Sequence, residues 1–235
     1  LEGSGQYLVM DFIEGNDLRQ LLSEGGLLSE TQVLKIGASV CDALEYLHGR
    51  QPPIIFRDLK PSNVMVANTG QVKLIDFGIA RTFKVGKKRD TIAMGSENYA
   101  APEQWGKGQT DARSDVYALG ATLYHLLANL APTPAFLPSE PLPLANYNQA
   151  VSRLTVALIE KAMARERTKR FQSIAEMRRA LGADRLGFDA CGARGGAGGC
   201  WWAAPEAVAD AEFERAYVEV STRAIERFKD SIRFE

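Results

Sequence analysis

The sequence predicts an α+β fold that is mainly α-helical and contains a small β-hairpin sheet, and three observations support this. An apolar stripe at helical spacing predicts one long, half-buried helix. The stripe consists of Val33, Ile36, Val40, Leu44 and Leu47. Residues 114–130 are almost continuously apolar and predict a second helix, buried in the core. Two short apolar runs, residues 64–66 and 72–75, flank a Gly-containing turn and predict the hairpin.

Three short elements are predicted before the long helix. Residues 7–12 form an apolar run that predicts a buried strand, and residues 14–16 predict the turn that ends it. Asp17 can cap a short helix, because its carboxylate can accept a hydrogen bond from a backbone N–H of the first turn. Ser29 has the same capping chemistry at the start of the long helix.

After the hairpin, loops and helices alternate. Residues 81–95 are polar and basic and predict a loop. Five prolines between residues 132 and 143 predict an extended loop, because proline fixes φ and lacks a backbone N–H. Residues 151–163 and 174–181 predict two further helices.

The composition changes at Gly182. Residues 182–204 are rich in glycine and predict a flexible linker. Residues 205–235 predict an amphipathic helix whose apolar face needs a partner surface. Two interpretations of this helix stay open: a segment that docks on its own domain, or the start of a helical repeat, since residues 223–228 resemble the second helix of a tetratricopeptide repeat.

The bulk composition excludes several classes of protein. A formal net charge of −1 gives no argument for nucleic-acid binding or for an anionic membrane surface. Three widely spaced cysteines favour reduced thiols over a disulfide framework, and no His or second Cys pair supports a metal site at Cys191 and Cys200. No run reaches the roughly 20 apolar residues of a membrane span. We therefore expect a cytoplasmic location and no membrane span in this chain.

Two short stretches carry the chemistry, residues 56–65 and residues 76–78. Phosphoryl transfer needs a carboxylate to receive the proton of the attacking hydroxyl, a cation near the transferring group and oxygen ligands for a metal. Asp58 can be the carboxylate, and Lys60 can be the cation. Asn63 and Asp76 offer hard oxygen ligands of the kind that Mg²⁺ prefers, and the hairpin between them brings them together.

The order of three motifs resembles one family. Arg-Asp-Leu-Lys-Pro-Ser-Asn begins at Arg57, Asp-Phe-Gly begins at Asp76, and Ala-Pro-Glu begins at Ala101. This series resembles the eukaryotic-type Ser/Thr protein kinase family, in a bacterial form, over about residues 7–181. The resemblance implies a protein-kinase-like fold, with residues 1–181 as the hinge and the large helical C-lobe of the catalytic domain.

By this resemblance, Asp58 is the catalytic base, Lys60 contacts the γ-phosphate of ATP, and Asn63 and Asp76 bind Mg²⁺. Lys60 also implies Ser/Thr substrates rather than Tyr. The resemblance further implies a nucleotide site with a gatekeeper, backbone groups that meet adenine, a ribose contact and an apolar floor. These positions are, in that order, Met10, Asp11 to Ile13, Asp17 and Met65.

Other matched residues imply support for the site. Ser96 matches the hydroxyl that bonds the catalytic Asp and Lys, and Asp115 matches the helix residue that holds the catalytic loop backbone. Glu103 and Arg170 match a buried ion pair of the family. Phe56 stands where the family usually has His, which predicts that the packing is kept and one hydrogen bond is lost.

The activation segment of the family often carries a phosphate that pairs with the Arg before the catalytic Asp. Arg57 holds that position here, and Thr91 is the candidate phosphosite, with Thr82 behind it. A plain loop threonine is the alternative interpretation of Thr91.

The expected Gly-rich loop, strand Lys and helix Glu have no counterpart before residue 7, so we expect the N-lobe to be largely missing. Two functions stay open. The first is a Ser/Thr protein kinase that uses ATP and Mg²⁺ on a protein substrate and needs the missing N-lobe or a partner. The alternative is a catalytically inactive kinase-like C-lobe that acts as a binding or regulatory module.

Overall fold

The structure is a computed structural model and describes residues 12–78, 80–82, 95–106, 109–139 and 143–188. The α-helices in this part of the chain are α1 (Leu18–Gly25), α2 (Glu30–His48), α3 (Ala112–Ala128), α4 (Arg153–Ala162) and α5 (Ile174–Phe188). The strands are β1 (Gly15–Asp17), β2 (Ile54–Ile55), β3 (Val64–Ala67), β4 (Val72–Leu74) and β5 (Arg81–Thr82). Short 3₁₀ turns are η1 (Pro61–Asn63), η2 (Pro102–Trp105), η3 (Leu144–Asn146) and η4 (Arg167–Lys169).

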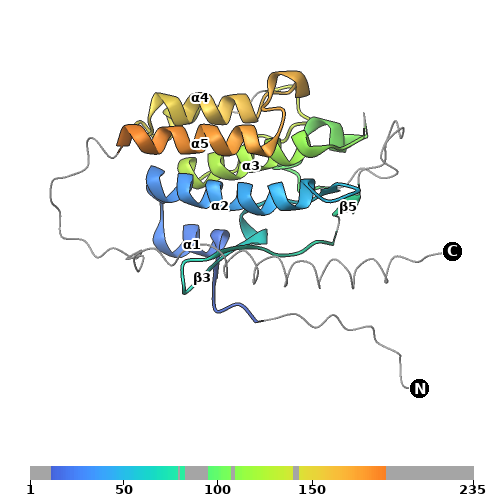
Figure 1. Cartoon of the computed structure of the whole chain (residues 1–235). Helices are drawn as coiled ribbons and strands as arrows, with labels where there is room; N and C mark the ends of the chain where they lie inside the picture. The colour runs from blue at the N-terminus through green and yellow to red at the C-terminus, as the bar shows by residue number, and fades with distance from the viewer. Residues whose placement is uncertain (1–11, 79, 83–94, 107–108, 140–142, 189–235) are drawn as a thin grey trace, which may run out of the picture. The chain divides into compact units, whose positions relative to one another are not determined.

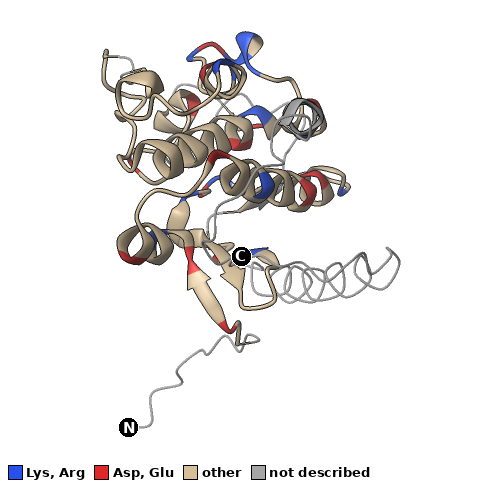
Figure 2. Ribbon diagram, turned by 90° about the vertical axis from the view of Figure 1, so that its left-hand side faces the viewer, with Lys and Arg blue, Asp and Glu red and all other residues tan. Residues whose placement is uncertain are grey.

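The helices form the core, as the apolar patterns predict. α2 packs against α3 and α5, and α4 packs against the same two helices (Figure 1). The predicted apolar stripe of α2 is buried throughout, from Val33 to Leu47. Gly120 lets α3 approach α4 closely, because a Cβ at this position would lie 2.8 Å from the Cβ of Ala162. Figure 2 shows acidic and basic residues interspersed along these helices, in line with the formal net charge of −1.

The helix starts follow the capping chemistry of the sequence, with one shift. Asp17 caps α1 and Ser29 caps α2, each in a reciprocal capping box, as predicted. α3 begins at Ala112 rather than at Ser114, because the carboxylate of Asp111 accepts a hydrogen bond from the backbone N–H of Arg113.

The small sheet has the strand order β1-β3-β4 and is antiparallel throughout. It confirms the predicted hairpin, and in Figure 1 it lies with α1 on the side of α2 away from α4. The predicted turn at residues 14–16 is wrong, because Gly15 and Asn16 belong to β1. Gly15 suits this place: any side chain there would collide with the backbone of Val66 on β3.

Two further boundaries differ from the predictions. Arg81 and Thr82 form β5 on β2 rather than the start of a loop, because backbone pairing does not need an apolar side-chain pattern. α5 continues to Phe188 rather than ending at Leu181. A glycine costs a helix only about 1 kcal/mol, so Gly182 does not end it when residues with good helix propensity follow.

Several predictions concern residues outside the described part of the chain. They are the strand at residues 7–11, Met10 and Asp11, most of the basic loop with Thr91, and everything from residue 189 on. By its contacts the chain divides into two units, Leu1–Gly195 and Gly196–Glu235, and all described residues belong to the first. The linker after residue 188 and the C-terminal helix stay predictions.

Candidate active site

The loop between β2 and η1 is fixed by a carboxylate of α3. Asp115 is fully buried, and its two oxygens accept hydrogen bonds from the backbone N–H of Phe56 at 2.9 Å and of Arg57 at 2.8 Å. His48 Nε2, at the end of α2, donates to the same carboxylate at 2.7 Å. Arg57 has a positive φ of 72°, a strained conformation for a residue with a side chain. These bonds therefore hold a strained backbone immediately before Asp58.

Asp58 stands in a compact polar cluster. Its carboxylate accepts hydrogen bonds from Lys60 Nζ at 2.8 Å and from Ser96 Oγ at 2.7 Å, and Lys60 Nζ also donates to Ser96 Oγ at 2.8 Å. Burial by itself raises the pKa of Asp58, but the hydrogen bonds from Lys60 and Ser96 outweigh it, so the pKa lies below its ordinary value. The carboxylate is therefore ionised at neutral pH.

Asn63 connects this cluster to Asp76. Its side-chain N–H donates to the backbone oxygen of Asp58 at 2.8 Å and to its carboxylate at 3.0 Å. The backbone oxygen of Asn63 accepts from the N–H of Ile75 at 2.9 Å, which ties the residue before Asp76 to Asn63. Asp76 is exposed, has a positive φ of 61°, and accepts a hydrogen bond from the Gly78 N–H at 3.1 Å.

The donor atoms at Asn63 and Asp76 suit a hard cation such as Mg²⁺, because both side chains offer oxygen. The described residues hold no group of three or more His, Cys, Asp or Glu side chains placed to bind a metal. A magnesium ion commonly completes its ligands with water and substrate phosphates, so two protein oxygens fit an ion that arrives with a nucleotide.

The residues expected to bind the nucleotide lie on or beside the small sheet. Asp17 on β1 lies directly opposite Met65 on β3, and both are half-buried. One oxygen of Asp17 caps α1 by accepting a hydrogen bond from the Gln20 N–H at 2.8 Å. Ile13, also half-buried, precedes β1.

Comparison with known proteins identifies the family. A sequence model described as the protein kinase domain matches residues 2–179. The chain belongs to the protein kinase domain family. Protein kinases in general use ATP and a divalent metal ion.

The relatives of this kinase domain include named bacterial Ser/Thr kinases. Serine/threonine-protein kinase PknB of Mycobacterium leprae is 35% identical over 183 residues, and PknB of Mycobacterium tuberculosis H37Rv is 34% identical over 184 residues. Each match covers 73% of this chain and 29% of the relative. The probable serine/threonine-protein kinase CE0033 of Corynebacterium efficiens is 37% identical over 187 residues, covering 73% and 28%. The chain thus spans less than a third of the length of these curated relatives.

Phe56 is fully buried in the kinase domain and packs edge to face on Phe77 of the Asp-Phe-Gly motif, with ring centroids 5.2 Å apart. The predicted packing of Phe56 is therefore confirmed. Such aromatic pairs add about 0.5–1.5 kcal/mol beyond the burial of their area.

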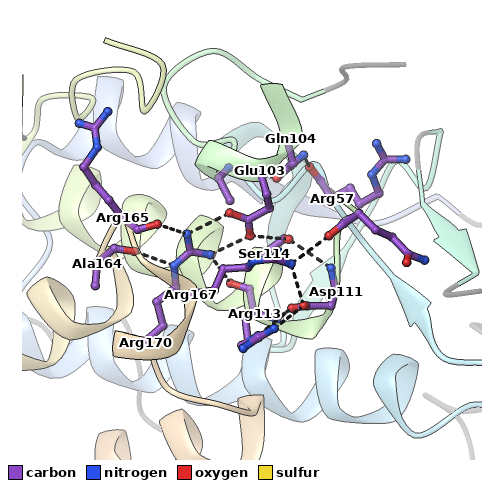
Figure 3. Close-up of polar contacts among 12 residues, drawn as sticks. Arg57, Glu103, Gln104, Asp111, Arg113, Ser114, Ala164, Arg165, Arg167 and Arg170 are labelled. Atoms are coloured by element: carbon purple, nitrogen blue, oxygen red, sulfur yellow. Dashed lines mark hydrogen bonds and ion pairs between the residues drawn. The ribbon is translucent and has the colours of Figure 1, made fainter. Parts of the chain in front are cut away.

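The predicted ion pair between Glu103 and Arg170 is present and buried (Figure 3). Arg170 donates to both carboxylate oxygens of Glu103, at 2.8 and 3.0 Å, and Ser114 Oγ donates to Glu103 at 2.8 Å. The guanidinium has five donors, and its other three hydrogen bonds go to backbone oxygens of Ala164, Arg113 and Arg165. This network anchors η2 to α3 and to the loop before α5.

The segment that carries Ser96 is also tied to α3. Tyr99 closes a turn on Ser96, with its N–H 3.0 Å from the Ser96 backbone oxygen, and its hydroxyl lies 2.7 Å from His125 Nδ1. Burial raises the pKa of Tyr99 to about 12 and lowers the pKa of His125. At neutral pH this hydrogen bond therefore joins a neutral phenol and a neutral imidazole.

Reasoning from the sequence missed three residues whose side chains help to hold the candidate site in place: His48, His125 and Gln104. The chain has only two histidines, so each was a signal that could have been weighed. Gln104 has no such signal, since a neutral amide after the Ala-Pro-Glu motif fits any polar surface. Among the described residues, no helix is both long and apolar enough for a transmembrane segment.

Proposed function

We propose that this kinase domain transfers the γ-phosphoryl group of ATP to Ser or Thr hydroxyls of a protein substrate. The cluster of Asp58, Lys60 and Ser96, joined to Asn63 by hydrogen bonds of 2.7–3.0 Å, carries the proposal. It holds an ionised carboxylate and an ammonium group side by side, and Asn63, one of the two proposed metal ligands, is hydrogen-bonded to the carboxylate. The names of the relatives support Ser and Thr as the acceptor residues.

In the proposed step the hydroxyl oxygen of the substrate attacks the γ-phosphorus, and the bond from phosphorus to the β–γ bridging oxygen breaks to release ADP. Asp58 orients the hydroxyl and accepts its proton. Lys60 neutralises charge on the transferring group, and its hydrogen bonds to Asp58 and Ser96 fix its position. Geometry and charge do most of the work in such a transfer.

The remaining site residues are proposed to hold the nucleotide. Asn63 and Asp76 would bind Mg²⁺, which supplies positive charge to the phosphate oxygens. Asp17 would contact the ribose, Met65 would lie under the base, and residues 10–13 would form the gatekeeper and the adenine contacts. Arg57 would pair with a phosphate on Thr91. A cytoplasmic location and a need for further protein segments stay predictions.

The test is transfer of radiolabelled phosphate from Mg-ATP to the chain itself and to a generic basic protein. Asp58→Asn is expected to lower the rate by about 10²–10⁴, the usual contribution of a general base. Asp42→Asn is the matched control, because Asp42 is 59% exposed and lies on α2 at a surface pair with Arg178.

Where residues 1–235 alone give no transfer, the same pair of variants is assayed in the longest natural protein that contains them. Transfer that depends on Asp58 upholds the kinase proposal. Transfer that is unchanged in Asp58→Asn overturns the proposed role of this site. Transfer that is absent from the longer protein overturns the kinase proposal and favours a non-catalytic binding module.

A further inference from the structure

The peptide group between Arg57 and Asp58 is held by a side chain that no motif points to. Gln104 Nε2 donates to the Arg57 backbone oxygen at 2.8 Å, in a buried hydrogen bond that joins positions 47 residues apart. On the other side of the same residue, the Arg57 N–H donates to Asp115 at 2.8 Å. The strained residue before Asp58 is therefore fixed at both of its peptide groups, once by α3 and once by η2.

Gln104 is itself rigidly placed. It is 2% exposed, and its Oε1 accepts a hydrogen bond from the Ala101 N–H at 3.1 Å. Its neighbour Glu103 carries the buried pair with Arg170 (Figure 3). A side chain whose own conformation is locked by packing and hydrogen bonds can fix the position of the group that it contacts.

The same side chain also lies close to the segment that carries Ser96. Gly95 has a positive φ of 150°, and a Cβ at this position would lie 2.8 Å from Gln104 Nε2. Ser96 follows directly and donates to Asp58 at 2.7 Å. Gln104 thus lies between the Arg57–Asp58 backbone and the segment that carries Ser96, whose hydroxyl bonds the Asp58 carboxylate.

We propose that Gln104 is a positioning residue for phosphoryl transfer: it fixes the Arg57–Asp58 peptide and keeps the Asp58 carboxylate aimed at Lys60 and Ser96. The inference rests on the proposed kinase function for its effect on rate. A planar peptide transmits the orientation of its carbonyl oxygen directly to the following residue. Losing the Gln104 donor removes a hydrogen bond from the Arg57 carbonyl next to Asp58 and lets the peptide turn.

Two variants separate the donor of Gln104 from its bulk. Gln104→Met removes the hydrogen bonds with the Ala101 N–H and the Arg57 oxygen at similar size. Gln104→Glu keeps the acceptor for Ala101 but can donate to the Arg57 oxygen only when its carboxylic acid is protonated. The matched control is Gln172→Met, because Gln172 also donates to backbone oxygens, those of Arg167, Thr168 and Arg170.

The rate is the first readout, taken in whichever form of the protein shows transfer that depends on Asp58. Gln104→Met is expected to lower kcat by about tenfold or more, with the KM for ATP within about twofold. For Gln104→Glu, the ratio of its kcat to that of the unsubstituted protein is expected to rise as the pH falls from about 8 to about 6. A general loss of stability does not give this pH profile. A kcat of Gln104→Met equal to that of Gln172→Met overturns the inference.

Nuclear magnetic resonance of residues 1–235 is the second readout and needs no activity. In Gln104→Glu the Arg57 carbonyl carbon and the Asp58 amide nitrogen are expected to shift, and to return toward their original values as the pH falls. If the chain proves not to be a kinase, these signals alone decide the structural part of the inference. Signals that are unchanged by either Gln104 variant overturn it, and a Gln104→Met chain that does not fold leaves the Gln104→Glu titration as the deciding result.

Discussion

The catalytic loop and the small sheet beside it supply different parts of the proposed site and are held in different ways. The backbone on both sides of Arg57, directly before Asp58, is held by the fully buried Asp115 of α3 and by Gln104 of η2. Asp76 is exposed, and Asp17 and Met65 lie half-buried on strands of three and four residues. Short strands gain little stability by themselves. The backbone before Asp58, the proposed proton acceptor, is thus set by buried side chains, whereas Asp17, Met65 and Asp76, which are proposed to hold nucleotide and metal, depend on a small sheet.

This difference teaches where the order of the site comes from. The loop stores strain at Arg57, and strain of about 1–3 kcal/mol persists only where surrounding contacts impose it. Asp115 and Gln104 are those contacts. The sheet ties Ile75, the residue before Asp76, to Asn63 through one backbone hydrogen bond. Variants of the core should therefore change stability and catalysis together, and variants of the sheet should change binding alone.

The largest loss of stability is expected from Arg170→Met. It leaves the buried Glu103 carboxylate without its partner, which costs about 3–5 kcal/mol in free energy of unfolding. Lys169→Met is the matched control, because Lys169 is 67% exposed and its surface pair with Glu166 contributes at most about 1 kcal/mol. Urea unfolding measures both. Equal losses in the two variants would contradict the role of this pair as the anchor of η2.

Asp115→Asn is expected to cost about 1–3 kcal/mol, because one backbone N–H of the loop then faces an amide N–H instead of an oxygen. The same change should speed amide exchange at Phe56 and Arg57 and lower kcat. Asp42→Asn serves again as the exposed control. A loop whose exchange is unaffected in Asp115→Asn would show that other contacts hold it.

Asp76→Asn tests the small-sheet part of the proposed site. Because Asp76 is exposed, the free energy of unfolding should change by less than about 0.5 kcal/mol. The affinity for Mg-ATP should fall by about tenfold or more, since one of two proposed metal ligands loses its charge. Calorimetric titration with and without Mg²⁺ measures this. Unchanged magnesium dependence would remove Asp76 from the proposed metal site.

The smallest effect is expected in how the free energy of unfolding depends on pH. Burial lowers the pKa of His125 in the folded chain, whereas the unfolded chain titrates near about 6.5. The unfolded state therefore binds the proton more readily, and stability is lost as the pH falls through that range. In His125→Gln this dependence should be shallower. Identical slopes of unfolding free energy against pH in both proteins would refute the assignment.

Much of the helical core and hairpin could be predicted from the sequence, because both depend on local periodicity and capping. The cluster around Asp58 could be anticipated because Asp58, Lys60 and Asn63 lie within six consecutive positions. Gln104 could not, because its role exists only through a contact across the fold. The strand at Gly15 was missed for the same reason: its glycine is explained by the approach of Val66, which the sequence does not display.

Hydrogen exchange of residues 1–235, followed at single amides with and without Mg-ATP, tests the central claim most directly. The amides of Phe56 and Arg57 should exchange slowly in the free chain, at rates near those of α3. The Ala67 amide of the small sheet, which donates to Gln71, should exchange faster in the free chain and slow on addition of Mg-ATP. Exchange at Phe56 and Arg57 as fast as at Ala67 in the free chain would contradict a loop set by the helical core.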